Sequence, residues 1–186
     1  GLDSRLRERI RDQMLHVLKA SETAALMVTH DSEEAMFMSD NIVVLRDGQV
    51  QQTGRPVNLY CQPNSAFVAE FFGEVNQLEG IVANGTIQTV LGVFEAPEDC
   101  VEGQQVQIVI RYEALFIEPD STGANAEVME ARLLGRASLI HLSVPTGTNT
   151  LHLHARVPGL NSLQSGSKVR ITVDPSQAFV FPSPAM

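Results

Sequence analysis

The chain has 186 residues, which is enough for one large domain or two small ones, each with its own core. Its formal net charge is −9, from 22 acidic and 13 basic residues, and this balance argues against a surface that binds nucleic acid. No apolar run approaches the roughly 18 residues of a membrane span, so we expect no direct membrane insertion. The two cysteines, Cys61 and Cys100, fall in different predicted domains, which favours free thiols over a disulfide.

The first predicted element is an amphipathic helix over residues 4–20. Apolar residues recur there at helical spacing, with arginines and acids between them. The spacing predicts one buried stripe along the helix, made of Leu6, Ile10, Met14, Val17 and Leu18.

A short apolar run over residues 24–28 has the length and the β-branched ending of a buried strand, and His30 follows it. Asp31, with Glu34 three residues later, matches a helix-capping pattern, so we expect a helix to begin here. His30 is therefore predicted at a junction between a strand and a helix. In open α/β sheets such junctions lie where ligands bind, and an imidazole can donate or accept a proton near neutral pH. A purely structural role for His30 stays open on this evidence.

The following residues predict a hairpin and two short helices. Residues 42–45 and 49–53 are expected to be strands, and Asp47-Gly48 is expected to be the turn between them. Short helices are expected over residues 56–60 and 65–72.

From Leu78 onward, short strands recur every eight to twelve residues, which predicts an all-β barrel or sandwich. The two similar sets of strands suggest two intertwined small barrels. The expected strands cover residues 78–83, 85–90, 93–95, 105–110, 114–117, 128–133, 138–144, 150–155, 169–173 and 178–181.

The spaced residues around His30 resemble the end of the nucleotide-binding domain of ABC transporter ATPases of the binding-protein-dependent importer type. The matching positions are Thr29-His30-Asp31, Glu34-Ala35, Asp40-Asn41-Ile42, Gly48, Gln52-Thr53-Gly54, Leu59-Tyr60, Pro63, Phe67-Val68-Ala69 and Phe71-Phe72-Gly73. The β-rich part resembles the carboxyl-terminal OB-type (TOBE) domain of the same ATPases. Ile110-Arg111-Tyr112-Glu113 stands at a family motif that normally carries proline in the third position, and Arg111 and Glu113 remain available to pair. Residues 132–141 and 153–159 look most like the ferric-iron importers of this family.

This resemblance implies an α/β remnant, the carboxyl-terminal part of a P-loop nucleotide-binding domain, followed by an all-β OB-like domain. The expected domains are residues 1–72 and 78–186, joined by a linker at 73–77. The sequence contains no Gly-x-x-x-x-Gly-Lys-Ser/Thr loop, no acidic strand end for magnesium and no Ser-Gly-Gly-Gln signature. We therefore expect a carboxyl-terminal fragment of an importer ATPase that is inactive alone and binds no cofactor.

The resemblance also implies roles in the intact subunit, where ATP and Mg²⁺ are the cofactors. His30 is expected to contact the γ-phosphate and the attacking water, and Asp3 is expected in a loop that crosses to the second subunit beside ATP. From its local sequence alone, Asp3 fits equally well as a residue favoured near the start of the following helix. The expected partners are membrane permease subunits and a second copy of the chain. The homodimer would form through the β domain and the nucleotide-binding remnant, in the cytoplasm at the inner face of the membrane.

Two other readings remain open. The chain fits a stand-alone OB-type binding or oligomerisation module, in which residues 1–72 form a dimerisation arm. An enzyme that uses His30 with Glu33 or Glu34 as an acid and base is less favoured, because no nucleophile can be named. His152 and His154 share one strand face near His141, but the sequence offers no carboxylate or cysteine at ligand spacing, so we predict no metal site.

Overall fold

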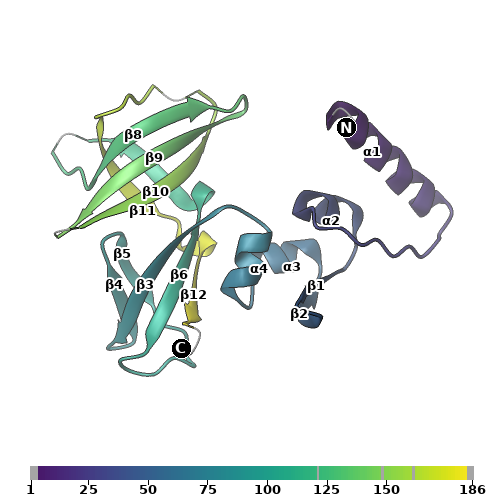
Figure 1. The fold of residues 1–186 in the computed structure, drawn as a ribbon, viewed down its shortest axis with the longest axis horizontal. Coiled ribbons are helices and arrows are strands. Elements are labelled where there is room, and N and C mark those ends of the chain that lie inside the picture. The colour runs from purple at the N-terminus through teal and green to yellow at the C-terminus, as the bar shows by residue number, and fades with distance from the viewer. Residues whose placement is uncertain (1–3, 121, 148, 161, 184–186) are drawn as a thin grey trace. The chain divides into compact units, whose positions relative to one another are not determined.

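The computed structural model describes residues 4–120, 122–147, 149–160 and 162–183. The chain divides into two compact units, Gly1–Tyr60 and Cys61–Met186 (Figure 1). The expected linker at 73–77 lies within the second unit, and its last three residues begin a strand, β3.

The first unit contains the predicted hairpin and three of the four predicted helices. Asp31 begins the second helix, because its Oδ1 accepts a hydrogen bond of 3.0 Å from the backbone N–H of Glu34. In the hairpin, Asp47 and Gly48 have φ of 52° and 76°, which is the left-handed pair that a tight two-residue turn requires. The elements are α1 (Ser4–Ala20), α2 (Ser32–Met38), β1 (Ile42–Arg46), β2 (Gln49–Gly54) and α3 (Pro56–Cys61), whose last residue belongs to the second unit.

The predicted strand at 24–28 is wrong, and so is the predicted burial along α1. Residues 24–28 form no strand, and the side chains of Leu26 and Val28 are 94% and 93% exposed. A strand needs a neighbour for its backbone hydrogen bonds, and none of the described residues pairs with this segment. Leu6, Ile10 and Met14 of α1 stay more than 40% exposed, because nothing in the described chain covers their stripe.

The second unit begins with the short helix α4 (Ala66–Phe71), which is capped by Ser65. The ten predicted strands of the β-rich part are all present. They are β3 (Val75–Ala83), β4 (Thr86–Thr89), β5 (Gly92–Glu95), β6 (Gln105–Arg111), β7 (Leu115–Pro119), β8 (Ala126–Leu133), β9 (Ala137–Thr146), β10 (Asn149–Pro158), β11 (Lys168–Val173) and β12 (Ala178–Pro182). The turns η1 (Tyr112–Ala114) and η2 (Pro175–Gln177) precede β7 and β12.

These strands form two five-stranded antiparallel sheets. Their orders are β10-β9-β8-β11-β7 and β12-β6-β3-β4-β5 (Figure 1). Alternate residues of the strands face one shared core. In β9, for example, Ile140, Leu142 and Val144 are buried while the residues between them are only partly covered. The core also includes Leu78, Val82, Ile87, Val106, Ile108, Ile110, Leu115, Val128, Leu153, Val169 and Ile171.

The buried guanidinium of Arg111 connects α4 to the sheets. Its Nη1 donates a hydrogen bond of 3.2 Å to the carbonyl of Ala69, and its Cζ lies 5.6 Å from the centre of the Phe179 ring. A cation near the last turn of a helix is favourable, and so is a cation over an aromatic face. Arg111 therefore holds α4, β6 and β12 together inside the second unit.

Candidate functional site

His30 lies at a bend immediately before α2, and its side chain is exposed. The residues on either side hold this bend, because the backbone N–H of Asp31 donates a hydrogen bond of 3.1 Å to Thr29 Oγ1. The capping bond from Glu34 to Asp31 then starts the helix. An exposed imidazole on a short, hydrogen-bonded bend can reach a ligand outside the chain. Asp3, the second predicted site residue, lies outside the described residues.

The other histidines of interest lie on one face of the β9–β10 hairpin. His154 is directly opposite His141, and their ring centres are 4.4 Å apart in an edge-to-face arrangement. Tyr112 stacks on His154 at 5.1 Å. His152 shares this face of β10, since the buried Leu153 points the other way, and its Nδ1 lies 3.2 Å from the sulfur of Met129.

The electrostatics of this face oppose a charged His154. Burial lowers the pKa of His154, and the nearby His141 lowers it further, whereas Glu74 raises it. Burial also raises the pKa of Tyr112. Arg156 forms ion pairs with Glu74 and, at 3.6 Å, with Glu113. In the part of the chain that the structure describes, no three His, Cys, Asp or Glu residues are arranged to hold a metal ion.

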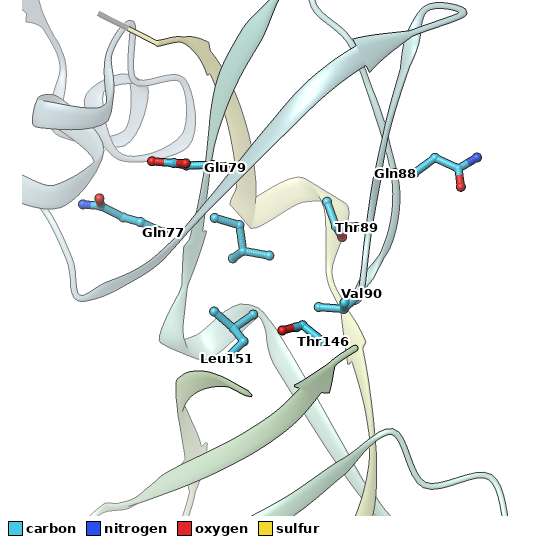
Figure 2. Close-up of a pocket in the computed structure, with 8 residues that line it drawn as sticks. Gln77, Glu79, Gln88, Thr89, Val90, Thr146 and Leu151 are labelled. Atoms are coloured by element: carbon cyan, nitrogen blue, oxygen red, sulfur yellow. The ribbon is translucent and has the colours of Figure 1, made fainter. Parts of the chain in front are cut away.

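A pocket of about 570 Å³ lies within the second unit, where β3, β4 and the end of the β9–β10 hairpin meet (Figure 2). Leu151, Thr146 and Val90 point into it, whereas Gln77, Glu79 and Gln88 point away from it. Leu78 and Thr89 complete the lining. We call this hollow the sheet-edge pocket.

Comparison with known proteins identifies the β-rich part. Residues 108–181 match the TOBE domain family. The second unit contains a TOBE domain.

The whole chain is also homologous to ATP-binding subunits of ABC importers. It is 35% identical over 193 aligned positions to the spermidine/putrescine import ATP-binding protein PotA of Pseudomonas fluorescens, covering 97% of the chain and 50% of that protein. It is 32% identical to the sulfate/thiosulfate import ATP-binding protein CysA 1 of Chromobacterium violaceum, covering 96% and 51%. It is also 32% identical to the Fe(3+) ions import ATP-binding protein FbpC of Fusobacterium nucleatum, covering 100% and 46%.

The chain spans about half the length of these relatives. The relatives are named for three different classes of solute, so the expected ferric-iron specificity is not singled out.

Among the described residues, no helix is both long and apolar enough to cross a membrane.

Sequence reasoning missed Asn76, which joins the two sheets of the TOBE unit. Its side chain is buried and forms two hydrogen bonds of 2.8 Å with the backbone of His154, one to the carbonyl and one from the N–H. Asn125 makes the same pair of contacts with Ile171, at 3.1 and 2.7 Å. The sequence offered one signal for this role. Asn76 is two residues before Leu78, so the alternation of side chains along a strand places this polar residue on the buried face of β3.

Proposed function

We propose that this chain is the carboxyl-terminal part of the ATP-binding subunit of an ABC importer, which in intact form couples ATP hydrolysis to solute uptake. The observation that carries this proposal is similarity to such subunits along nearly the whole chain, across both the Thr29-His30-Asp31 segment and the TOBE domain. In the proposed assignment, residues 1–72 are the end of the nucleotide-binding domain, and residues 78–186 are the TOBE domain.

His30 is the proposed catalytic residue of the intact subunit. Its imidazole is exposed on the bend before α2, where it can contact the γ-phosphate and orient the attacking water. Such a contact stabilises charge that develops during phosphoryl transfer. Asp3 is proposed to lie beside ATP at the boundary between two subunits.

ATP and Mg²⁺ are the proposed cofactors of the intact subunit. The phosphate-binding loop and the metal supply most of the catalysis in phosphoryl transfer, and neither that loop nor its acidic partners occur in these 186 residues. We propose that this chain supplies three parts of the intact subunit: His30, Asp3 at the boundary between two subunits, and the TOBE domain.

Ferric iron is the proposed solute, and the support is the resemblance of residues 132–141 and 153–159 to ferric-iron importers. One of the similar proteins carries an Fe(3+) name, while others are named for polyamines or for sulfate and thiosulfate. We expect no residue of this chain to touch the solute. Uptake of labelled iron, putrescine and sulfate by cells that lack the encoding gene would identify it.

The proposed partners are membrane permease subunits and a second copy of the chain, with the intact subunit at the cytoplasmic face of the membrane. Support for the homodimer is the apolar surface of the first unit, where the side chains of Leu26 and Val28 are more than 90% exposed. Apolar surface of this extent in water favours contact with another chain.

The decisive experiment measures ATP hydrolysis by the intact subunit with His30→Ala. We expect a loss of about 100-fold in kcat, the scale seen when one stabilising contact to the transition state is removed. His16→Ala is the matched control, because His16 is also exposed in the first unit but lies on α1. Equal hydrolysis by the two variants would overturn the role of His30.

A stand-alone OB-type binding module is the second candidate function. The observation that favours it is the shared hydrophobic core of the two sheets, which lies wholly within the second unit. The coding sequence upstream separates the candidates, since only the importer subunit requires a phosphate-binding loop there.

A further inference from the structure

The sheet-edge pocket borders two strand edges that have no strand beside them. β10 is the edge strand of its sheet. β3 pairs with β6 over residues 75–81 but meets β4 only at Val82 and Ala83. Among the described residues, no strand pairs with the second side of β3 between 75 and 81. The pocket thus opens where the two sheets separate.

The free edge of β10 presents hydrogen-bonding groups toward a neighbour. The N–H and C=O of His154 point away from β9, since both bond to the side chain of Asn76. In an antiparallel pair, alternate residues direct their backbone groups to the same side. Thr150 and His152 therefore direct theirs to the same free edge, and no hydrogen bond to these groups is seen in the described chain.

The direction of the backbone groups on β3 can be assigned in the same way. Glu74 accepts a backbone bond of 3.1 Å from Tyr112, and Val82 donates one of 3.0 Å to Gln104, so the even-numbered residues face β6. The backbone groups of Gln77 and Glu79 then face away from β6. This direction agrees with Figure 2, where both residues line the pocket although their side chains point away from it.

The interior and rim of the pocket indicate what it would accept. Leu78, Val90 and Leu151 supply apolar walls, with Thr89 and Thr146 beside them. The volume of about 570 Å³ lies within the range of ligand pockets, roughly 300–1,000 Å³. Glu79 is the one charged residue among those that line it, in a chain of net charge −9. Its side chain points out of the pocket, so a ligand with an apolar group inside and a basic group outside, beside Glu79, suits this opening.

We infer that the sheet-edge pocket binds an extended peptide segment of a partner protein, which adds a strand to β10. The backbone of this segment bonds to Thr150 and His152, and one apolar side chain enters the pocket between Leu78 and Leu151. A lysine or arginine of the segment lies beside Glu79 at the rim. Strand addition of this kind takes its affinity from backbone hydrogen bonds and its specificity from pockets for alternate side chains.

Asn76 sets where the added strand stops. Its amide already occupies the backbone groups of His154, so an incoming segment has only the part of the edge from His152 toward Thr150. This limit favours one register and opposes pairing along the whole strand, which would promote aggregation.

The test uses the full 186-residue chain and a short synthetic peptide of alternating valine and threonine with a lysine at each end. Methylation of every second backbone nitrogen leaves this peptide one bonding edge. A control peptide is methylated on every backbone nitrogen. We expect the first peptide to shift the amide NMR signals of Thr150, His152, Gln77 and Glu79, and the control peptide to leave them unchanged. Equal shifts from both peptides, or shifts confined to other residues, would overturn the inference.

A pair of variants checks the pocket itself. Val90→Trp fills the pocket from the β4–β5 turn and should weaken peptide binding about tenfold, as expected for loss of an anchoring side chain. Val93→Trp is the matched control, because Val93 is exposed on the neighbouring β5 and does not line the pocket. Thermal melting first confirms that both variants fold. Unchanged binding by Val90→Trp would also overturn the inference.

Discussion

The side chain of Asn76 in β3 pairs with the backbone of His154 in β10 as a strand would, through two hydrogen bonds of 2.8 Å. One residue thus connects the two sheets of the TOBE unit. Asn125, which precedes β8, makes the same two contacts with the backbone of Ile171 in β11, but within a single sheet. In both cases an amide supplies the donor and the acceptor that a neighbouring strand would provide.

Asn76→Ala should lower the free energy of unfolding of the second unit by about 2 kcal/mol, because it leaves a backbone donor and acceptor of His154 without their partner. Urea denaturation followed by circular dichroism measures the change. Asn149→Ala is the control, since Asn149 is exposed at the start of the same strand, β10, and should shift the midpoint little. Equal destabilisation by the two substitutions would contradict this role for Asn76.

The second unit begins at Cys61 in the structure, whereas the sequence predicts a domain that begins at residue 78, and the two pieces can be compared directly. Residues 61–186, expressed alone, should unfold in one cooperative transition. Residues 78–186 lack Asn76 and the Ala69 carbonyl that bonds to Arg111, so we expect them to be less stable by about 3 kcal/mol. Residues 1–72 alone should show no cooperative transition. Equal melting of the two longer pieces would support the boundary at 73–77 that the sequence predicts.

The contacts of Asp120, in the β7–β8 loop, predict that the fold loses stability in acid. Hydrogen bonds from the backbone of Gly123 and Thr122, and from the Thr122 hydroxyl, lower the pKa of Asp120 from 3.8 to about 2. The Arg170 guanidinium, 2.8 Å away, acts in the same direction. Because the folded-state pKa is the lower one, ionised Asp120 stabilises the fold above pH 3.8, and this contribution is lost as the pH falls toward 2.

Asp120→Asn should therefore reduce the loss of stability between pH 4 and pH 2 that urea denaturation measures for the unchanged chain. Asp99→Asn provides the comparison, since Asp99 is exposed in the β5–β6 loop. If both variants keep the full acid dependence, the hydrogen bonds around Asp120 do not control it.

The chain alone should hydrolyse no ATP above background, because its sequence contains no phosphate-binding loop. Release of inorganic phosphate from Mg²⁺ and ATP measures this. The result that would contradict the importer assignment is hydrolysis that survives purification and disappears in His30→Ala.

The exposed apolar residues of the first unit predict a homodimer. The sequence predicts that a partner chain covers Leu6, Ile10, Met14, Val28 or Val44. Val44 is already buried within the single chain, so we expect the contact at the other four, which are exposed. Sedimentation velocity should show a dimer that Val28→Asp shifts toward monomer. Val101→Asp is the control, because Val101 is exposed in the second unit. A monomer whose first unit resists hydrogen exchange would contradict this expectation.

Local sequence patterns by themselves determined most of the helices, strands and turns of this protein. The ten strands of the TOBE unit were predictable because they recur every eight to twelve residues with turn residues between them. The cap at Asp31 and the turn at Asp47-Gly48 were predictable for a similar reason, since each depends on a few adjacent residues. The spaced residues around His30 also identified the family that the whole-chain comparison supports.

Only the tertiary structure decided which strands meet and which apolar residues are covered. Residues 24–28 have the composition of a strand, yet they form none, because a strand exists only with a neighbour to accept its backbone bonds. The orders of the strands in the two sheets were also decided at this level. The contact of Arg111 with Ala69 joins residues 42 positions apart, and the contact of Asn76 with His154 joins residues 78 positions apart. Such contacts depend on how distant segments pack, and no local pattern of residues encodes that packing.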